Sequence, residues 1–154
     1  MKIIIQNYIE NINKRYKTGI SREHSYRGDL QNLLQELIPN VLVTNEPARV
    51  SCGAPDYILT KKNIPVGYIE AKDIGEPLDG KKKHKEQFDR YKNSLPNLIF
   101  TDYLDFRLYR DGRFVASVRI TEVKIGKKDF EIQENNPETG RIRINDTQYF
   151  DNVP

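Results

Sequence analysis

Two acidic side chains and one lysine lie at the ends of two short apolar segments, where together they could hold a metal ion against a phosphate. Asp56 opens the segment 56–60, while Glu70, fourteen residues later, and Lys72 lie in the segment 66–74. Mg²⁺ prefers oxygen ligands, and one or two carboxylates often bind it together with phosphate oxygens of a substrate. The pattern therefore predicts metal-assisted hydrolysis of a phosphodiester, with the lysine orienting or deprotonating the attacking water.

The two segments are predicted to form an antiparallel hairpin whose turn is centred on Asn63. That centre places Asp56 opposite Glu70, with their Cβ atoms roughly 5 Å apart. Glu70 and Lys72 are two residues apart on one strand, so they point to the same face. Two carboxylates this close repel each other unless a cation lies between them. An ordinary charged hairpin is the alternative, but the segment 66–74 is largely apolar, which is typical of a central strand.

The elements that would position these residues are predicted from apolar periodicity and from Gly and Pro breaks. Apolar residues at steps of three and four predict three helices, over 3–17, 21–38 and 84–95. Ser21 is the expected N-cap of the second helix, and Pro39 stops it. Extended segments predict strands over 41–45, 56–60, 66–74, 98–102, 105–110 and 113–120. This order predicts an α/β fold with a mixed central sheet flanked by helices.

Length and composition indicate one domain. The chain has 154 residues, enough for a single hydrophobic core. No apolar run approaches the roughly 18 residues of a membrane span, and the N-terminus turns polar too soon for a signal peptide, so we expect a cytoplasmic protein. The single cysteine, Cys52, excludes a disulfide framework and a thiolate metal site within one chain. We expect a domain over residues 1–123, and a polar peripheral hairpin or partly disordered tail over 124–154.

Positive charge is clustered in one short run. The net charge of +3 is too small to indicate a polyanionic partner by itself. Residues 81–92, however, contain six Lys and Arg residues against two acids. Such a run is typical of a solvated helix face, and it would equally suit contacts with nucleic-acid phosphates. If it contacts DNA, the predicted contacts are Lys81, Lys82, Lys83 and Lys85.

The sequence resembles the PD-(D/E)XK nuclease superfamily. Pro55-Asp56 followed by Glu70-Ala71-Lys72 is similar to the motif that names the superfamily, and the predicted order of elements is similar to its restriction-endonuclease-like αβββαβ core. The resemblance implies a Mg²⁺-dependent deoxyribonuclease, with Mn²⁺ as a substitute ion. It also implies that Asp56, Glu70 and the Ala71 carbonyl bind the metal and that Lys72 acts in catalysis.

Two further features extend the resemblance. Gln87 and Tyr91 are similar to the Q-h-x-x-Y motif of a branch that includes the nuclease domains of bacterial recombination exonucleases. This implies catalytic support by Gln87 and a DNA contact by Tyr91, while a helix face turned to the core would explain the pair without any site. Many superfamily members carry an acid on the first core helix that adds to the metal site, and Glu23 is the best match for this third ligand, with Glu36 the competitor. Arg27, one turn after Glu23, would pair with it or contact a phosphate.

Over residues 20–120 the chain resembles the N-terminal nuclease segment of large restriction-modification proteins that also carry an N6-adenine DNA methyltransferase. This implies an endonuclease that acts on DNA beside methyltransferase or helicase parts of the same system. The chain itself lacks an Asn/Asp-Pro-Pro-aromatic motif and a glycine-rich cofactor loop. An excised domain, a separate subunit and a truncated remnant all stay open. A catalytically silent DNA-binding or assembly module and a structural domain with a chance motif are the alternatives.

Overall fold

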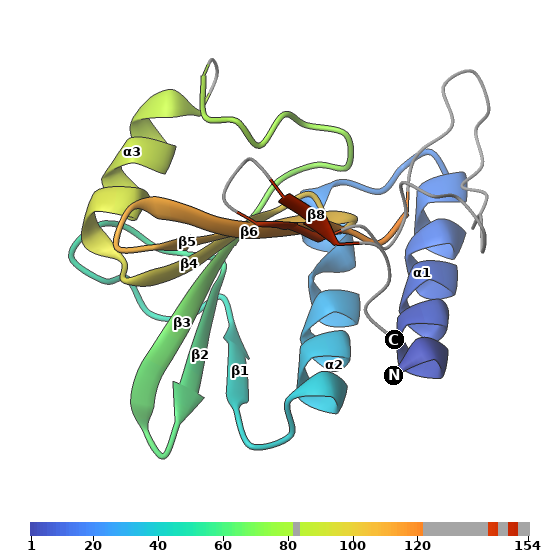
Figure 1. The fold of residues 1–154 in the computed structure, drawn as a ribbon. Coiled ribbons are helices and arrows are strands. Elements are labelled where there is room, and N and C mark those ends of the chain that lie inside the picture. The colour runs from blue at the N-terminus through green and yellow to red at the C-terminus, as the bar shows by residue number, and fades with distance from the viewer. Residues whose placement is uncertain (82–83, 122–141, 145–147, 151–154) are drawn as a thin grey trace.

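The computed structural model describes residues 1–81, 84–121, 142–144 and 148–150, which form helices around one mixed sheet (Figure 1). In chain order the elements are α1 (Lys2–Lys17), the 3₁₀ helix η1 (Glu23–Tyr26), α2 (Arg27–Leu37), β1 (Leu42–Asn45), β2 (Tyr57–Lys61), β3 (Ile64–Ala71), α3 (Lys85–Ser94), β4 (Asn97–Thr101), β5 (Asp105–Arg110), β6 (Arg113–Arg119), β7 (Ile142–Ile144) and β8 (Gln148–Phe150). The predicted order of helix, three strands, helix and strand is confirmed, as is the α/β class.

The strands lie in the sheet in the order in which they follow in the chain, from β1 to β8. Strands β3 and β4 pair in parallel, and the other neighbours pair antiparallel. A parallel pair needs a crossover connection, and α3 supplies it between β3 and β4. The carboxyl ends of these two strands therefore lie side by side, and Glu70 and Ala71 are at the carboxyl end of β3.

The hairpin of β2 and β3 has the register predicted at its open end. Tyr57 lies opposite Ile69, so the two acids face each other one step beyond this pair. The predicted turn centre is wrong by half a residue, because Lys62 and Asn63 both have positive φ and form a two-residue turn typical of type I′. A bulge that adds Val66 to β3 restores the register. The prediction was thus right at the acids and wrong at the tip.

Two apolar clusters cover the sheet, one on each face. Successive side chains of a strand point to opposite faces, and Ile69 and Tyr68 accordingly join different clusters. The cluster formed with α1 and α2 contains Tyr8, Ile12, Leu30, Val43, Tyr57 and Ile69. The cluster formed with α3 contains Phe88, Tyr91, Leu95, Leu98 and Phe100. Figure 1 shows α1 beside α2, with α3 on the other side of the strands.

The start of the second helix differs from the prediction. A 3₁₀ turn from Glu23 to Tyr26 precedes α2, and Ser21 does not cap it. The Ser21 hydroxyl instead donates a 2.8 Å hydrogen bond to the carbonyl of Arg15, in the last turn of α1. The hydroxyl therefore stabilises the end of one helix instead of the start of the next.

Within residues 124–154 the structure describes only β7 and β8, which pair with each other and extend the sheet beyond β6. The rest of that segment, and with it the boundary predicted near residue 123, lies outside the described residues. None of the helices in the described ranges has the length and apolarity needed to cross a membrane.

Candidate active site

The two acids of the predicted site meet at the carboxyl end of β3. The Ala71 amide donates a 2.8 Å hydrogen bond to Asp56 Oδ2. The carbonyl of Asp56 accepts a 2.9 Å bond from the Glu46 amide, which holds the chain just before β2. Asp56 is 8% exposed and Glu70 4%. Burying two neighbouring carboxylates costs free energy unless cations or donors compensate them, so their partners decide what the site can do.

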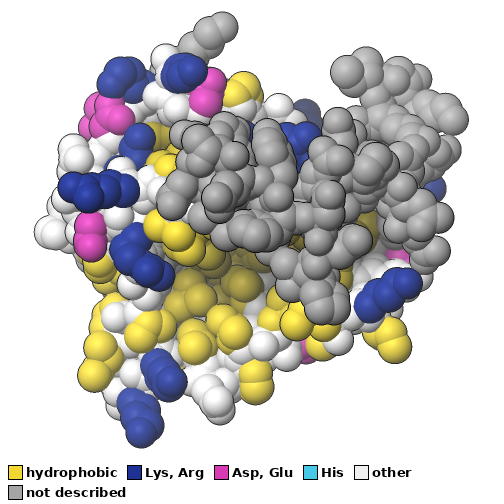
Figure 2. All heavy atoms as spheres, viewed as in Figure 1, with side chains coloured by type: hydrophobic (Ala, Val, Ile, Leu, Met, Phe, Trp, Pro, Cys, Tyr) yellow, Lys and Arg dark blue, Asp and Glu magenta, His cyan; other side chains and the backbone are white. Residues whose placement is uncertain are grey.

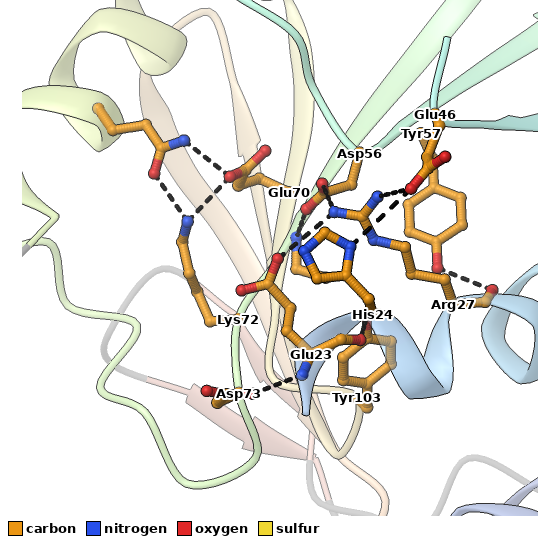
Figure 3. Close-up of polar contacts among 12 residues, drawn as sticks. Glu23, His24, Arg27, Glu46, Asp56, Tyr57, Glu70, Lys72, Asp73 and Tyr103 are labelled. Atoms are coloured by element: carbon orange, nitrogen blue, oxygen red, sulfur yellow. Dashed lines mark hydrogen bonds and ion pairs between the residues drawn. The ribbon is translucent and has the colours of Figure 1, made fainter. Parts of the chain in front are cut away.

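Lys72, Glu70 and Gln87 form a closed ring of hydrogen bonds. The Lys72 ammonium lies 2.9 Å from Glu70 Oε1 and donates a 2.7 Å bond to Gln87 Oε1 (Figure 3). Gln87 Nε2 in turn donates a 2.8 Å bond to Glu70 Oε1. Lys72 directly follows β3, and Gln87 lies on α3. The crossover helix α3 therefore holds the lysine in place, and residues predicted from two separate motifs lie together.

The second oxygen of Glu70, Oε2, is buried and has no hydrogen-bond partner among the residues that the structure describes. Burial, together with the negative charge of Asp56, raises the pKa of the Glu70 carboxyl to about 7. A bound cation would supply the missing partner and would favour the ionised carboxylate. The orphaned oxygen beside a second carboxylate therefore fits a hard divalent ion such as Mg²⁺.

No group of three or more His, Cys, Asp or Glu side chains within the described ranges is arranged to hold a metal ion. The third ligand predicted at Glu23 is therefore not part of such a group. The Glu23 carboxylate lies 3.5 Å from Arg27, and burial followed by the charge of Asp56 raises its pKa. The competitor Glu36 is exposed on α2. A metal here would bind two carboxylates, and its remaining ligands would be backbone, water or substrate oxygens.

Arg27 lies buried among the carboxylates, and its contact with DNA stays a prediction. The residue is 7% exposed, and its guanidinium forms a close ion pair with Asp56. It also lies 2.8 Å from Glu46 Oε1 and 3.5 Å from Glu23 Oε1, so Figure 3 shows it between Asp56 and Glu46. In this structure the guanidinium is therefore directed at three acids. The pairing with Glu23, the other predicted option, is confirmed.

Several residues that support the site carry no signal in the sequence. Tyr103 has a φ of 74°, and its hydroxyl donates a 2.6 Å bond to the Glu23 carbonyl. Asp73 Oδ1 accepts a 2.5 Å bond from the Glu23 amide, across 50 residues of chain. The Tyr57 hydroxyl donates a 2.8 Å bond to the Arg27 carbonyl. These bonds hold η1 and the start of α2 against the strands, but no spacing rule connects their partners.

The surface of α3 is less basic than its sequence indicates. Lys85 pairs with Asp89, and Arg90 lies 2.6 Å from Glu86. Figure 2 shows basic and acidic side chains interleaved over this helix. Lys81 is exposed, while Lys82 and Lys83 lie outside the described residues.

Tyr91, predicted to contact DNA, lies in the core of this structure. Its side chain is 2% exposed and belongs to the apolar cluster of α3. The ring packs so closely on Gly53 that a Cβ there would lie 2.9 Å from the Tyr91 hydroxyl. Tyr91 therefore supports the core, which is the alternative that the sequence left open.

The chain is similar to part of a solved structure, but its sequence matches no known family model. No protein-family model matches the chain, and no curated protein matches it significantly. The cryo-EM structure of a DrdV–DNA complex resembles it with a TM-score of 0.62 and 22% sequence identity. The match covers 75% of this chain and 12% of the DrdV chain. The chain therefore shares its fold with a small part of a larger protein whose structure was solved with DNA.

Proposed function

We propose that this chain is a Mg²⁺-dependent nuclease domain of a restriction-modification system, which hydrolyses phosphodiester bonds of DNA. The observation that carries the proposal is the buried Oε2 of Glu70, which has no hydrogen-bond partner among the described residues. It lies near Asp56 and Lys72, at the carboxyl end of β3. The shared fold with part of a protein solved in complex with DNA supports DNA as the substrate. Methyltransferase or helicase parts of the same system, which the sequence resemblance implies, would choose the target.

Asp56, Glu70 and the Ala71 carbonyl would hold the metal, with Mn²⁺ as a substitute. When bound, Mg²⁺ makes water more acidic and neutralises negative charge that develops on the phosphate. The Ala71 amide holds Asp56 in place from the opposite strand. Glu70 Oε1 accepts hydrogen bonds from Lys72 and Gln87, so Oε2 would be the oxygen that binds the cation.

Lys72 would act on the water and on the phosphate. Its ammonium has three N–H donors, and Glu70 and Gln87 accept from two of them. The third can donate to a phosphate oxygen or orient the attacking water, and a positive charge there stabilises charge that develops in the transition state. Gln87 acts as a positioning residue, because it links the ammonium to the acid that holds it.

The test is nicking of supercoiled plasmid DNA in Mg²⁺ or Mn²⁺. Wild type should nick the plasmid, whereas Asp56→Ala and Lys72→Ala should be slower by about 100-fold or more. Equal rates for wild type and both variants would contradict the enzymatic assignment. If the isolated domain is inactive, Mn²⁺ titration follows, and absence of binding that depends on Asp56 and Glu70 would contradict the metal site.

A catalytically silent DNA-binding or assembly module is the second candidate. One observation favours it: both carboxylate oxygens of Asp56 already have protein partners, Arg27 and the Ala71 amide. Such a module would bind DNA with the same affinity whether or not a divalent ion is present. It would also leave the plasmid intact, which separates it from the nuclease.

A further inference from the structure

We infer that Arg27 competes with the divalent cation for Asp56 and so lowers the metal affinity of the site. The inference rests on the proposed metal site at Asp56 and Glu70. Arg27 donates from Nη2 to Asp56 Oδ1 and is 7% exposed, so this ion pair is nearly dehydrated. The Arg27 guanidinium therefore occupies, with its own positive charge, the Asp56 oxygen that a metal ion would contact.

The competition follows from the charges. A guanidinium cannot lose its proton in a protein, so Arg27 stays positive at any working pH. A divalent cation on Asp56 would bring two more positive charges next to it, where burial weakens screening by water. Either the two cations coexist at a cost in affinity or Arg27 leaves Asp56. Both routes make metal binding weaker than it would be without Arg27.

Arg27 has other acceptors within reach, which makes its release from Asp56 feasible. Its Nη1 lies 2.8 Å from Glu46 Oε1, and the same Nη2 that contacts Asp56 lies 3.5 Å from Glu23 Oε1. A small rotation can therefore move Nη2 from Asp56 to Glu23 while the bond to Glu46 stays. The Tyr57 hydroxyl holds the backbone carbonyl of Arg27, so the side chain moves and the helix does not.

The experiment measures Mn²⁺ binding by isothermal titration calorimetry, without DNA. Arg27→Gln should bind Mn²⁺ about tenfold more tightly than wild type. The matched control is Arg15→Gln, because Arg15 also pairs with an aspartate of α2, at 2.6 Å from Asp29, and its loss changes the net charge equally. Arg15→Gln should bind Mn²⁺ as wild type does. Circular dichroism checks that each variant is folded.

The outcomes separate this inference from the proposed function. If wild type binds Mn²⁺ in a way that Asp56→Asn abolishes, and Arg27→Gln binds equally or more weakly, Arg27 does not compete and the metal site stands. If neither wild type nor Arg27→Gln shows binding that depends on Asp56, the proposed function itself fails. Should Arg27→Gln not fold, Arg27→Met replaces it, because methionine keeps an unbranched side chain and carries no charge. It should also bind Mn²⁺ more tightly than wild type, and unchanged affinity would overturn the inference.

Discussion

The Ala71 amide and the Asp56 carboxylate are joined by a 2.8 Å hydrogen bond that links the end of β3 to the residue before β2. The donor is a backbone group of a fully buried residue, so the sheet itself sets the place of the carboxylate. A carboxylate on a longer side chain could not occupy the same place. The position of Asp56, and not only its charge, should therefore matter for activity.

We predict that Asp56→Glu slows plasmid nicking about 100-fold, although the charge is kept. The extra methylene shifts the carboxylate away from the Ala71 amide, and a displacement of about 1 Å can cost that factor. Initial rates in saturating Mg²⁺ provide the measurement. Glu36→Asp, a conservative exchange at an exposed position of α2, is the control and should leave the rate unchanged. Equal rates for Asp56→Glu and wild type would mean that the hydrogen bond does not position a ligand.

Glu70 should make the stability of the metal-free protein fall as pH rises. Burial, with the charge of Asp56, raises the folded-state pKa of Glu70 to about 7, from 4.5. Between these pH values the folded state therefore binds more protons than the unfolded chain. The stability that this proton contributes is lost as pH rises through 7. The free energy of unfolding of wild type relative to Glu70→Gln should fall by on the order of 3 kcal/mol between pH 4 and pH 8.

Urea unfolding in EDTA measures this difference, and the comparison with Glu70→Gln cancels the contribution of the other buried acids. Glu36→Gln serves as the control, because Glu36 is exposed and its loss should not change the pH dependence. A difference that is constant or grows with pH would show that folding does not raise the pKa of Glu70.

Gly80 should tolerate a side chain much less well than Gly75. Both have positive φ, but a Cβ at Gly80 would lie 2.7 Å from the Phe88 ring, while nothing lies within 4 Å at Gly75. Phe88 is buried and stacks on Phe100 with centroids 3.9 Å apart, so it cannot move freely. Gly80→Ala should lose about 2 to 4 kcal/mol in urea unfolding, against about 1 kcal/mol for Gly75→Ala. Equal losses would mean that the positive φ, and not the contact with Phe88, determines the cost of a side chain at Gly80.

The lysines before α3 should carry the contact with DNA that the helix itself does not. Replacement of Lys81, Lys82 and Lys83 by Ala should weaken DNA binding, and each lost phosphate contact should reduce the slope of log affinity against log salt by about 0.9. Lys85→Ala is the comparison, because Lys85 already pairs with Asp89 and its loss should change the slope less. Fluorescence anisotropy at several salt concentrations gives the slopes. An unchanged slope for the triple variant would assign this run to a solvated surface.

Much of the fold follows from local rules. Apolar steps of three and four predict the helices, and alternation with Gly and Pro breaks predicts the first six strands. The meeting of Asp56 and Glu70 follows from the hairpin register alone. The bulge at Val66 could not be predicted in this way. The two-residue turn and the bulge shift the register in opposite directions, so their effects cancel at the pair of acids.

The surroundings of the acids could not be predicted in the same way. Arg27 lies 29 residues from Asp56 in the chain, and only the packing of α2 on the sheet turns its guanidinium inward. Tyr91 has the spacing of a functional motif, yet the apolar cluster of α3 buries it. Tyr103 supports Glu23 from a left-handed backbone conformation that tyrosine rarely adopts. Each of these depends on tertiary packing that no local pattern encodes.

We propose above all that Glu70 binds a divalent cation through Oε2 and that this cation is needed to cut DNA. The most direct test is the initial rate of plasmid nicking as a function of Mg²⁺ concentration, for wild type and Glu70→Gln. Glutamine keeps the size of the side chain and removes the charge. We predict a saturable dependence on Mg²⁺ for wild type, abolished by EDTA, and a rate at least about 100-fold lower for Glu70→Gln. Nicking by Glu70→Gln at the wild-type rate and with the same dependence on Mg²⁺ would contradict the claim.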